Sequence, residues 1–189
     1  MSKIALFVGS VRQDRQGIKV VRWVERKLAD RNHTVYFNDP LELKLPLLDR
    51  MYKEMSDPSP KLRDLWIKIK DAEGYLAVTP EYNRSTSAAM KNTLDYFLEE
   101  YFFKPSAIVS YSAGIFGGIN AAQQLRLVFA ELGAPSIPSS FTISRVMDTF
   151  SQSGDLIDTS LDKRVIRFLT EFEWYIEAFK CQREKGTPY

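Results

Sequence analysis

Hydrogen-bond donors are concentrated between Gly9 and Gly17, just after a short apolar run near the N-terminus. Ser10 offers a hydroxyl, Arg12 a guanidinium and Gln16 an amide, which are groups that hold phosphate oxygens. A helix starting here would add unpaired backbone N–H groups and the positive end of its dipole. The segment lacks the Gly-Lys-Ser/Thr of a P-loop and the further glycines of a dinucleotide fingerprint. It therefore favours the terminal phosphate of a mononucleotide, with an ordinary polar turn as the alternative.

A second polar segment, residues 79–85, has side chains that could recognise a flat ring. Tyr82 offers an aromatic face for stacking, and Asn83 with nearby backbone N–H groups could bind the polar edge of the ring. Glu81 would either order the turn or carry a charge for the ligand. A proline-initiated turn followed by a helix cap is the plain alternative.

A third segment, residues 110–118, is rich in small residues. Small residues let the backbone come close to a ligand. The same composition also suits a strand-to-helix turn that needs unusual dihedral angles, so this segment by itself is a weak indication.

Side chains for other kinds of catalysis are scarce, since the chain has one cysteine, Cys181, and one histidine, His33. A Cys/His zinc site and an internal disulfide are therefore excluded, and we expect no metal site. A Ser-His-Asp or Cys-His nucleophile would need His33 as its base, but His33 lies in a polar turn before a short apolar run. We expect no catalytic side chain, so that the chemistry of an enzyme built on this chain belongs to a bound cofactor.

Apolar runs alternate with helical patterns along the chain. Short runs predict strands at residues 4–8, 35–37, 75–78, 107–109 and 141–143. Apolar residues at helical spacing predict helices at residues 18–28, 62–69, 85–101, 122–132 and 160–182, and residues 40–60 look irregular. The alternation predicts one domain, residues 1–189, built on a parallel sheet with helices on both faces. The three polar segments would then leave strands at one edge of the sheet.

The overall charge argues against polyanionic partners. Lys and Arg number 26 and Asp and Glu 24, giving a net charge of +2, which does not support general binding to nucleic acid or to an anionic membrane. No apolar run is long enough for a signal peptide or a membrane span. With a single cysteine as well, we expect a cytoplasmic protein.

Three motifs, in this order, give the chain a resemblance to NAD(P)H-dependent FMN reductases. They are Gly9-Ser10-x-Arg12, then Pro80-Glu81-Tyr82-Asn83-x-Ser85 with Lys91-Asn92-x-x-Asp95, then Ser112-x-Gly114-x-x-Gly117-Gly118-x-x-Ala121 with Leu125-Arg126. The resemblance covers roughly residues 3–146, and the second motif is its most specific part.

The resemblance implies a flavodoxin-like three-layer α/β/α sandwich, with a five-stranded parallel sheet of strand order 2-1-3-4-5 and non-covalently bound FMN. The FMN phosphate would lie at Ser10, Arg12, Gln16, Gly17 and Ile18. The ring would lie at Pro80, Glu81, Tyr82 and Asn83, with Ser112, Ala113, Gly114, Gly117 and Gly118 on its far side. Relatives form homodimers, and some form homotetramers. Lys91, Asn92 and Asp95 would have structural or interface roles.

The activity implied by the resemblance is hydride transfer from NADPH or NADH through FMN to a small acceptor. Candidate acceptors are a quinone, an azo dye, free flavin, and a ferric or chromate species. A flavodoxin-type electron carrier and a non-catalytic FMN-binding module are the alternatives. Flavodoxins tend to be strongly acidic, so the net charge of +2 counts modestly against a carrier. The intact loops count against a module without redox function.

The chain departs from the family pattern in three places. Asp14 and Arg15 stand where small or neutral donors are expected, and because a carboxylate repels a phosphate, Asp14 should point outward or cap the helix. Tyr96 replaces a tryptophan and keeps an aromatic body. The last helix is long and aromatic, and we expect Trp174 and Tyr175 to belong to the core rather than to an oligomer contact or a cover over the flavin.

Overall fold

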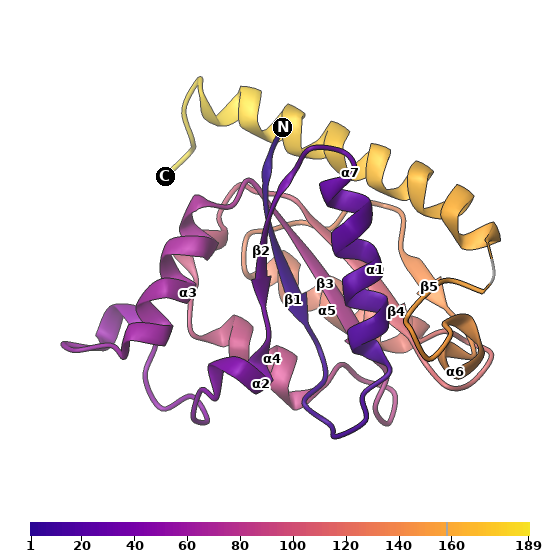
Figure 1. Cartoon of the computed structure of the whole chain (residues 1–189). Helices are drawn as coiled ribbons and strands as arrows, with labels where there is room; N and C mark the ends of the chain where they lie inside the picture. Colours follow the sequence, from indigo (N-terminus) through magenta and orange to yellow (C-terminus); the bar gives the residue numbers. More distant parts are fainter. Residues whose placement is uncertain (158) are drawn as a thin grey trace.

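Five parallel strands form the centre of the computed structural model, which describes residues 1–157 and 159–189 (Figure 1). The strand order is β2-β1-β3-β4-β5, as predicted. The strands are β1 (Lys3–Val8), β2 (Thr34–Asn38), β3 (Gly74–Pro80), β4 (Ser106–Tyr111) and β5 (Phe141–Ile143). All four pairings are parallel, so the carboxyl ends of all five strands lie at the same edge of the sheet.

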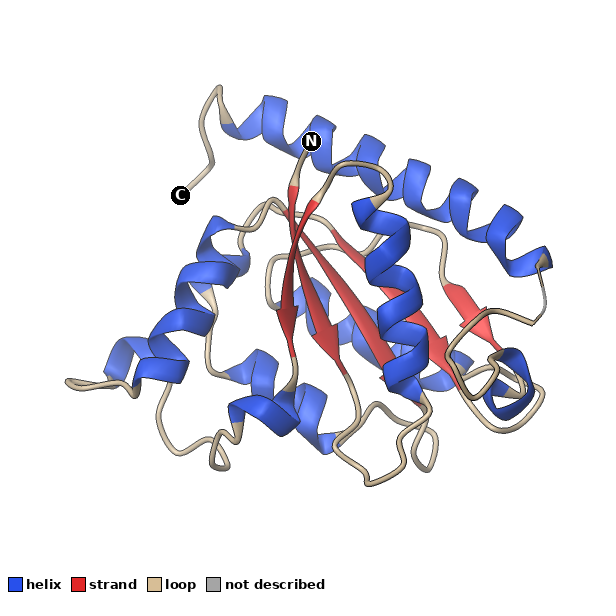
Figure 2. Cartoon of the chain, in the orientation of Figure 1, coloured by secondary structure: helices blue, strands red, loops and turns tan. Residues whose placement is uncertain are grey.

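Helices cover both faces of this sheet (Figure 2). They are α1 (Gly17–Ala29), α2 (Pro40–Leu43), α3 (Pro60–Asp71), α4 (Ala88–Asp95), α5 (Ile119–Glu131), α6 (Val146–Thr149) and α7 (Ser160–Arg183), with short 3₁₀ turns at Tyr52–Glu54 and Glu99–Tyr101. The buried residues of α1 and α7 belong to one hydrophobic core, and those of α3, α4 and α5 to a second core on the other face. The three-layer α/β/α sandwich is therefore confirmed. No helix of the described residues is long and apolar enough to cross a membrane.

Strand β1 shows how the two cores are divided. Ile4 and Leu6 belong to the core beneath α1 and α7, whereas Ala5 and Phe7 belong to the opposite core. Successive side chains of a strand point to opposite faces, so a strand buried on both faces must be apolar throughout. The run Ile4–Val8 meets this requirement and is fully buried.

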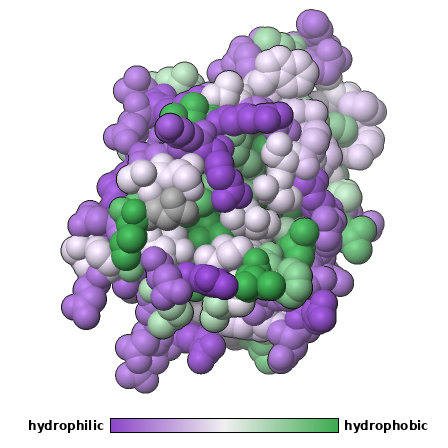
Figure 3. Space-filling model, turned by 90° about the vertical axis from the view of Figure 1, so that its right-hand side faces the viewer, coloured by the Kyte–Doolittle hydropathy of each residue, from purple (hydrophilic) through white to green (hydrophobic). Residues whose placement is uncertain are grey.

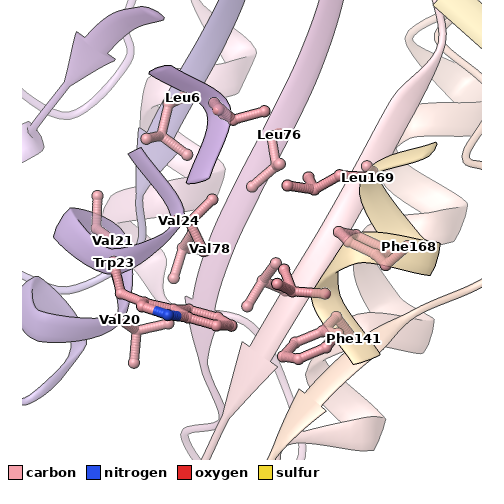
Figure 4. Packing of buried hydrophobic residues seen from close by; sticks show 14 of the residues in the cluster. Leu6, Val20, Val21, Trp23, Val24, Leu76, Val78, Phe141, Phe168 and Leu169 are labelled. Carbon is pink, nitrogen blue, oxygen red and sulfur yellow. The ribbon is translucent and has the colours of Figure 1, made fainter. Parts of the chain in front are cut away.

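Aliphatic and aromatic side chains pack together in the core beneath α1 and α7 (Figure 4). Trp23 of α1 lies against Phe141 of β5, with ring centroids 5.8 Å apart, and Phe141 lies 5.7 Å from Phe168 of α7. The indole N–H of Trp23 donates a hydrogen bond to the Asp162 carboxylate, 3.2 Å away. This chain of contacts joins the first and last helices, which are about 140 residues apart in the sequence.

The expectation for Trp174 is wrong, because this side chain is 65% exposed. Phe172 and Ile176 are buried on the inner face of α7. Trp174 is two residues from each of them, or about 200° around the helix, so its side chain faces away from the sheet. Tyr175 is half-buried and packs against the core, as expected.

Three local features differ from the prediction. The helix predicted to reach residue 101 ends at Asp95, and the buried aromatic rings of Tyr96 and Tyr101 lie in the turns that follow it. The predicted irregular region contains the short helix α2, which begins with Pro40 and is capped by Asp39. Helix α6 is also additional. Helices α2 and α6 are each about one turn long, too short for a periodic sequence pattern to predict.

The two faces of α7 give a direct test of this packing. Phe172→Ala should lower the free energy of unfolding by about 3–5 kcal/mol, since it opens a cavity in the core. Trp174→Ala should change it by less than about 0.5 kcal/mol, since the side chain is exposed. Urea unfolding of both variants would measure the difference. Equal losses would show that the orientation of α7 is wrong.

Candidate functional site

A cavity of about 460 Å³ opens at the carboxyl edge of the sheet, a volume typical of small-molecule sites. It is lined by Ser10, Arg12, Gln13, Asp14, Arg15, Gln16, Pro80, Glu81, Tyr82, Tyr111, Ser112, Ala113, Val146 and Met147. All three polar segments singled out in the sequence therefore meet around one cavity. The predicted contacts Gly17, Ile18, Asn83, Gly114, Gly117 and Gly118 lie outside this lining.

The first loop presents its donors at the start of α1. Ser10 is almost fully buried, at 1% exposure, and its hydroxyl shares a 2.7 Å hydrogen bond with the hydroxyl of Tyr82. The backbone N–H of Arg12 also donates to the Ser10 hydroxyl, at 3.3 Å. The Arg12 side chain is exposed, with its guanidinium carbon 5.8 Å from the centre of the Tyr82 ring. The Tyr82 side chain therefore lies close to both an exposed cation and a buried hydroxyl.

Helix α1 begins at Gly17 without a side-chain cap. The backbone N–H groups of its first turn are the donors that an anion can use, which suits the predicted roles of Gly17 and Ile18. Gly17 has a steric requirement of its own: a Cβ atom there would lie 1.9 Å from the Tyr111 hydroxyl oxygen. Only glycine allows the start of the helix to approach this tyrosine.

Arg15 fastens the first loop to the end of β2. Its guanidinium makes a bidentate ion pair with Asp39 and donates to the backbone oxygen of Ser10 at 2.6 Å. The pair is buried, with 11% of the Arg15 side chain and 4% of the Asp39 side chain exposed. The hydrogen bond to Asp39 raises the pKa of Arg15. This departure from the family pattern therefore has a structural use, and Asp39 neutralises the charge.

Asp14 lies at the exposed edge of the cavity, in a left-handed conformation with φ of 37°. Its exposure agrees with the expectation that it points outward. It does not cap α1, since no side chain does.

The second loop is a tight turn in which Tyr82 and Ser85 exchange backbone hydrogen bonds of 2.9 and 3.1 Å. Asn83 occupies the left-handed region, with φ of 51°, and its side chain is exposed. The Glu81 carboxylate is occupied within the protein. It accepts hydrogen bonds from the backbone N–H groups of Asn120 and Ala121, at 2.9 and 3.3 Å. Of the two roles left open for Glu81, the structure supports ordering the turn.

The third loop contributes Ser112 and Ala113 to the lining. Gly117 and Gly118 have φ of 63° and 80°, which other residues rarely adopt. A Cβ on Gly118 would lie 2.9 Å from the backbone oxygen of Tyr111. These glycines shape the turn into α5 rather than line the cavity.

Sequence reasoning missed several lining residues. Tyr111 falls within the third polar segment, but no contact was predicted for it, and in the structure it ends β4. Val146 and Met147 follow β5, where the backbone N–H of Val146 donates to Ser112 and that of Arg145 to Gly114, both at 3.0 Å. Their position after the carboxyl end of the fifth strand was the available signal.

The outer rim near the third loop is partly apolar. Ile115, Phe116 and Met147 are exposed, and Figure 3 shows hydrophobic side chains interspersed with hydrophilic ones on the side of the molecule that carries α6. A flat, uncharged molecule could lie against such a rim.

The remaining predicted residues have structural contacts. Asn92 accepts from the backbone N–H of Leu48 at 2.9 Å and donates to the backbone oxygen of Pro46 at 2.8 Å, and Tyr96 donates to the same oxygen. Lys91 and Asp95 form an ion pair one helical turn apart. These contacts are structural, one of the two roles expected for Lys91, Asn92 and Asp95.

Neither His33 nor Cys181 belongs to the cavity. The His33 ring shares a 2.7 Å hydrogen bond with Glu173, and Cys181 is exposed on α7. Within residues 1–157 and 159–189, no group of three or more His, Cys, Asp or Glu side chains could hold a metal ion.

The residues at the cavity fit FMN. A buried hydroxyl, tyrosine hydroxyls, an uncapped helix start and the Arg12 guanidinium suit a phosphate, and Pro80 and Tyr82 offer surfaces for a ring. The carboxylates of Asp39 and Glu81 are occupied by Arg15 and by the start of α5, which limits their repulsion of an anion.

The buried ion pair predicts a large effect at Asp39. Asp39→Ala should lower the free energy of unfolding by about 3 kcal/mol, because it leaves Arg15 buried without a counter-ion. Asp71→Ala is the matched control, since Asp71 pairs with Lys3 at the exposed surface and should lose much less. Chemical denaturation would compare them, and similar losses would contradict the structural role of the Arg15–Asp39 pair.

Comparison with known proteins identifies the family of the chain. The NADPH-dependent FMN reductase family matches residues 2–148. The NAD(P)H-dependent FMN reductase ntnL of Nectria sp. is 37% identical over 134 residues, 66% of each chain, so the match spans about two thirds of that relative. A quinone reductase of Pseudomonas putida KT2440 is 28% identical over 170 residues, covering 82% of this chain and 84% of its own.

Among solved structures, the FerB flavoenzyme NAD(P)H:(acceptor) oxidoreductase of Paracoccus denitrificans shares the fold. Its TM-score is 0.79 at 24% identity, over 95% of this chain and 99% of FerB. The predicted fold, cofactor and class of enzyme are confirmed together: the chain belongs to the NADPH-dependent FMN reductase family.

Proposed function

We propose that the chain binds FMN in the 460 Å³ cavity and passes a hydride from NADPH or NADH to a small diffusible acceptor. One observation carries the proposal: the loops after β1, β3 and β4 line a single cavity whose donors gather at one helix start. Bound FMN would supply the hydride chemistry. The protein has only to bind and orient its partners, so no side-chain acid or base is needed.

The binding roles follow from the lining. Ser10, Arg12 and Gln16 would hold the phosphate together with the backbone of Gly17 and Ile18. The ring would lie against the turn from Pro80 to Asn83. The loop from Ser112 to Gly118 would lie on the far side of the ring. Gly114, Gly117 and Gly118 would set the path of the backbone in this loop. The apolar wall at Val146 and Met147 would exclude water from one side of the cavity.

We favour quinones as acceptors. The exposed apolar rim at Ile115, Phe116 and Met147 suits a flat, weakly polar molecule, and the Pseudomonas putida relative is named a quinone reductase. Azo dyes, free flavin, and ferric or chromate species remain candidates. We place the protein in the cytoplasm.

We also propose a homodimer, with a homotetramer as the larger form. Ile119 and Leu127 are exposed on α5, and α4 with Lys91 and Asp95 lies on the same face of the sheet. Burying such side chains against a second copy would remove apolar surface from water. Sedimentation velocity would test this, and a monomer at micromolar concentration would contradict it.

The reductase is tested by flavin content and turnover. The protein supplied with FMN should retain flavin absorbance through gel filtration and oxidise NADPH or NADH in the presence of a quinone. The same protein without FMN is the control and should be inactive. Retention of no flavin, together with no nucleotide oxidation, would refute the proposal.

An electron carrier is the second candidate, and rapid mixing separates the two. In a reductase, NADPH bleaches the bound flavin directly in the absence of any other protein. A carrier would keep its flavin colour with NADPH and would lose it only to a one-electron donor. The near-neutral net charge of +2 favours the reductase.

Arg12→Ala should weaken FMN binding by roughly ten- to hundredfold, because a charge-assisted contact is worth about 1.5–3 kcal/mol. Arg22→Ala is the matched control, since Arg22 lies further along α1 and pairs with Glu25. Quenching of flavin fluorescence on binding would give both dissociation constants. An unchanged constant for Arg12→Ala would remove Arg12 from the site.

A further inference from the structure

Tyr111 is a buried polar residue of the cavity to which no role has been assigned. It is the last residue of β4 and lines the cavity together with Ser10 and Tyr82. Only 5% of its surface is exposed. The remainder of its side chain belongs to the core beneath α1 and α7, so its ring is held in place.

The Tyr111 hydroxyl lies at the start of α1. A Cβ on Gly17 would lie 1.9 Å from this oxygen and 2.4 Å from the ring carbon that carries it. Gly17 is the first residue of the helix, where the free N–H groups and the positive end of the dipole are found. The hydroxyl therefore lies where an anion would bind.

Three hydroxyl groups meet at this point. The hydroxyls of Ser10 and Tyr82 are hydrogen-bonded at 2.7 Å, and both residues influence the pKa of Tyr111. Burial raises the pKa of Tyr111, and the nearby Tyr82 raises it further, while Ser10 and Arg15 oppose the shift without reversing it. Tyr111 stays protonated at neutral pH and can donate a hydrogen bond.

Arg15 is poorly placed to donate a hydrogen bond to an anion in the cavity. Its guanidinium is occupied by Asp39 and by the backbone oxygen of Ser10. A buried neutral donor beside it complements an anion without adding a second buried charge that would need a counter-ion.

We propose that the Tyr111 hydroxyl donates a hydrogen bond to the phosphate of FMN and so helps the protein to bind FMN in preference to riboflavin. This inference rests on the proposed function, because it assigns a residue to the same cavity. It adds a binding residue from strand β4 to the donors of the first loop.

The test compares two ligands that differ by the phosphate alone. Tyr111→Phe removes one oxygen and keeps the ring that packs in the core. We expect the dissociation constant for FMN to rise about tenfold or more, as for other hydrogen bonds to charged groups, and the constant for riboflavin to change less than twofold. Fluorescence titration of the purified apoprotein measures both.

Tyr75→Phe is the matched control. Tyr75 is also a buried strand tyrosine, but it is the second residue of β3, near the amino edge of the sheet, and its hydroxyl donates to the backbone oxygens of Ile69 and Glu100. It should leave both dissociation constants unchanged. Tyr111→Met, which keeps bulk without a donor, serves as the second variant if Tyr111→Phe folds poorly, and circular dichroism verifies folding.

Two results would overturn the inference. Equal weakening of FMN and riboflavin would show that Tyr111 supports the cavity only through packing. No change for either ligand would show that its hydroxyl does not reach the phosphate. Failure of the wild-type protein to bind FMN at all would instead refute the proposed function, so the two failures are distinguishable.

Discussion

Parallel pairing of the five strands is the constraint on which the rest of this structure depends. Because β1 pairs in parallel with both β2 and β3, and β4 with both β3 and β5, every loop that leaves a carboxyl end opens at one edge. Both faces of the sheet are sealed by apolar side chains of the helices. Polar loops far apart in the sequence therefore gather at this edge, and the cavity lies among them.

Electrostatic pairing determines which groups remain for a ligand. Arg15 and Asp39 satisfy one another and tie the first loop to the end of β2, and Glu81 is held by the start of α5. Two potentially repulsive carboxylates are thereby occupied. The groups left facing the cavity include hydroxyls, side-chain amides, backbone N–H groups and the Arg12 guanidinium, a set that complements a phosphate, and the Asp14 carboxylate lies at the exposed edge.

Residue types and spacing were sufficient to predict a parallel sheet with helices on both faces and three polar loops at one edge, and the family resemblance implied the strand order and just over half of the residues that line the cavity. Continuous apolar runs identify strands buried on both faces, and the inner stripe of α7 follows helical periodicity from Leu161 to Ile176. Ser10, Tyr82 and Ser112 could be found because polar residues after a buried strand stand out.

The rest depends on tertiary contacts that no local pattern encodes. The sequence predicted no contact for Tyr111, and the proposed role of its hydroxyl depends on Gly17 lying beside it. Asp39 is an ordinary helix cap until Arg15 reaches it across 24 positions in the sequence. Trp174 shows the reverse case, since an aromatic residue in an aromatic helix faces solvent.

A crystal structure of the protein grown with FMN would show whether the cavity at the carboxyl edge is the FMN site. We expect the phosphate at the start of α1 beside Ser10, and the ring against the turn at Pro80–Asn83. FMN bound elsewhere, or the phosphate directed away from α1, would contradict this expectation.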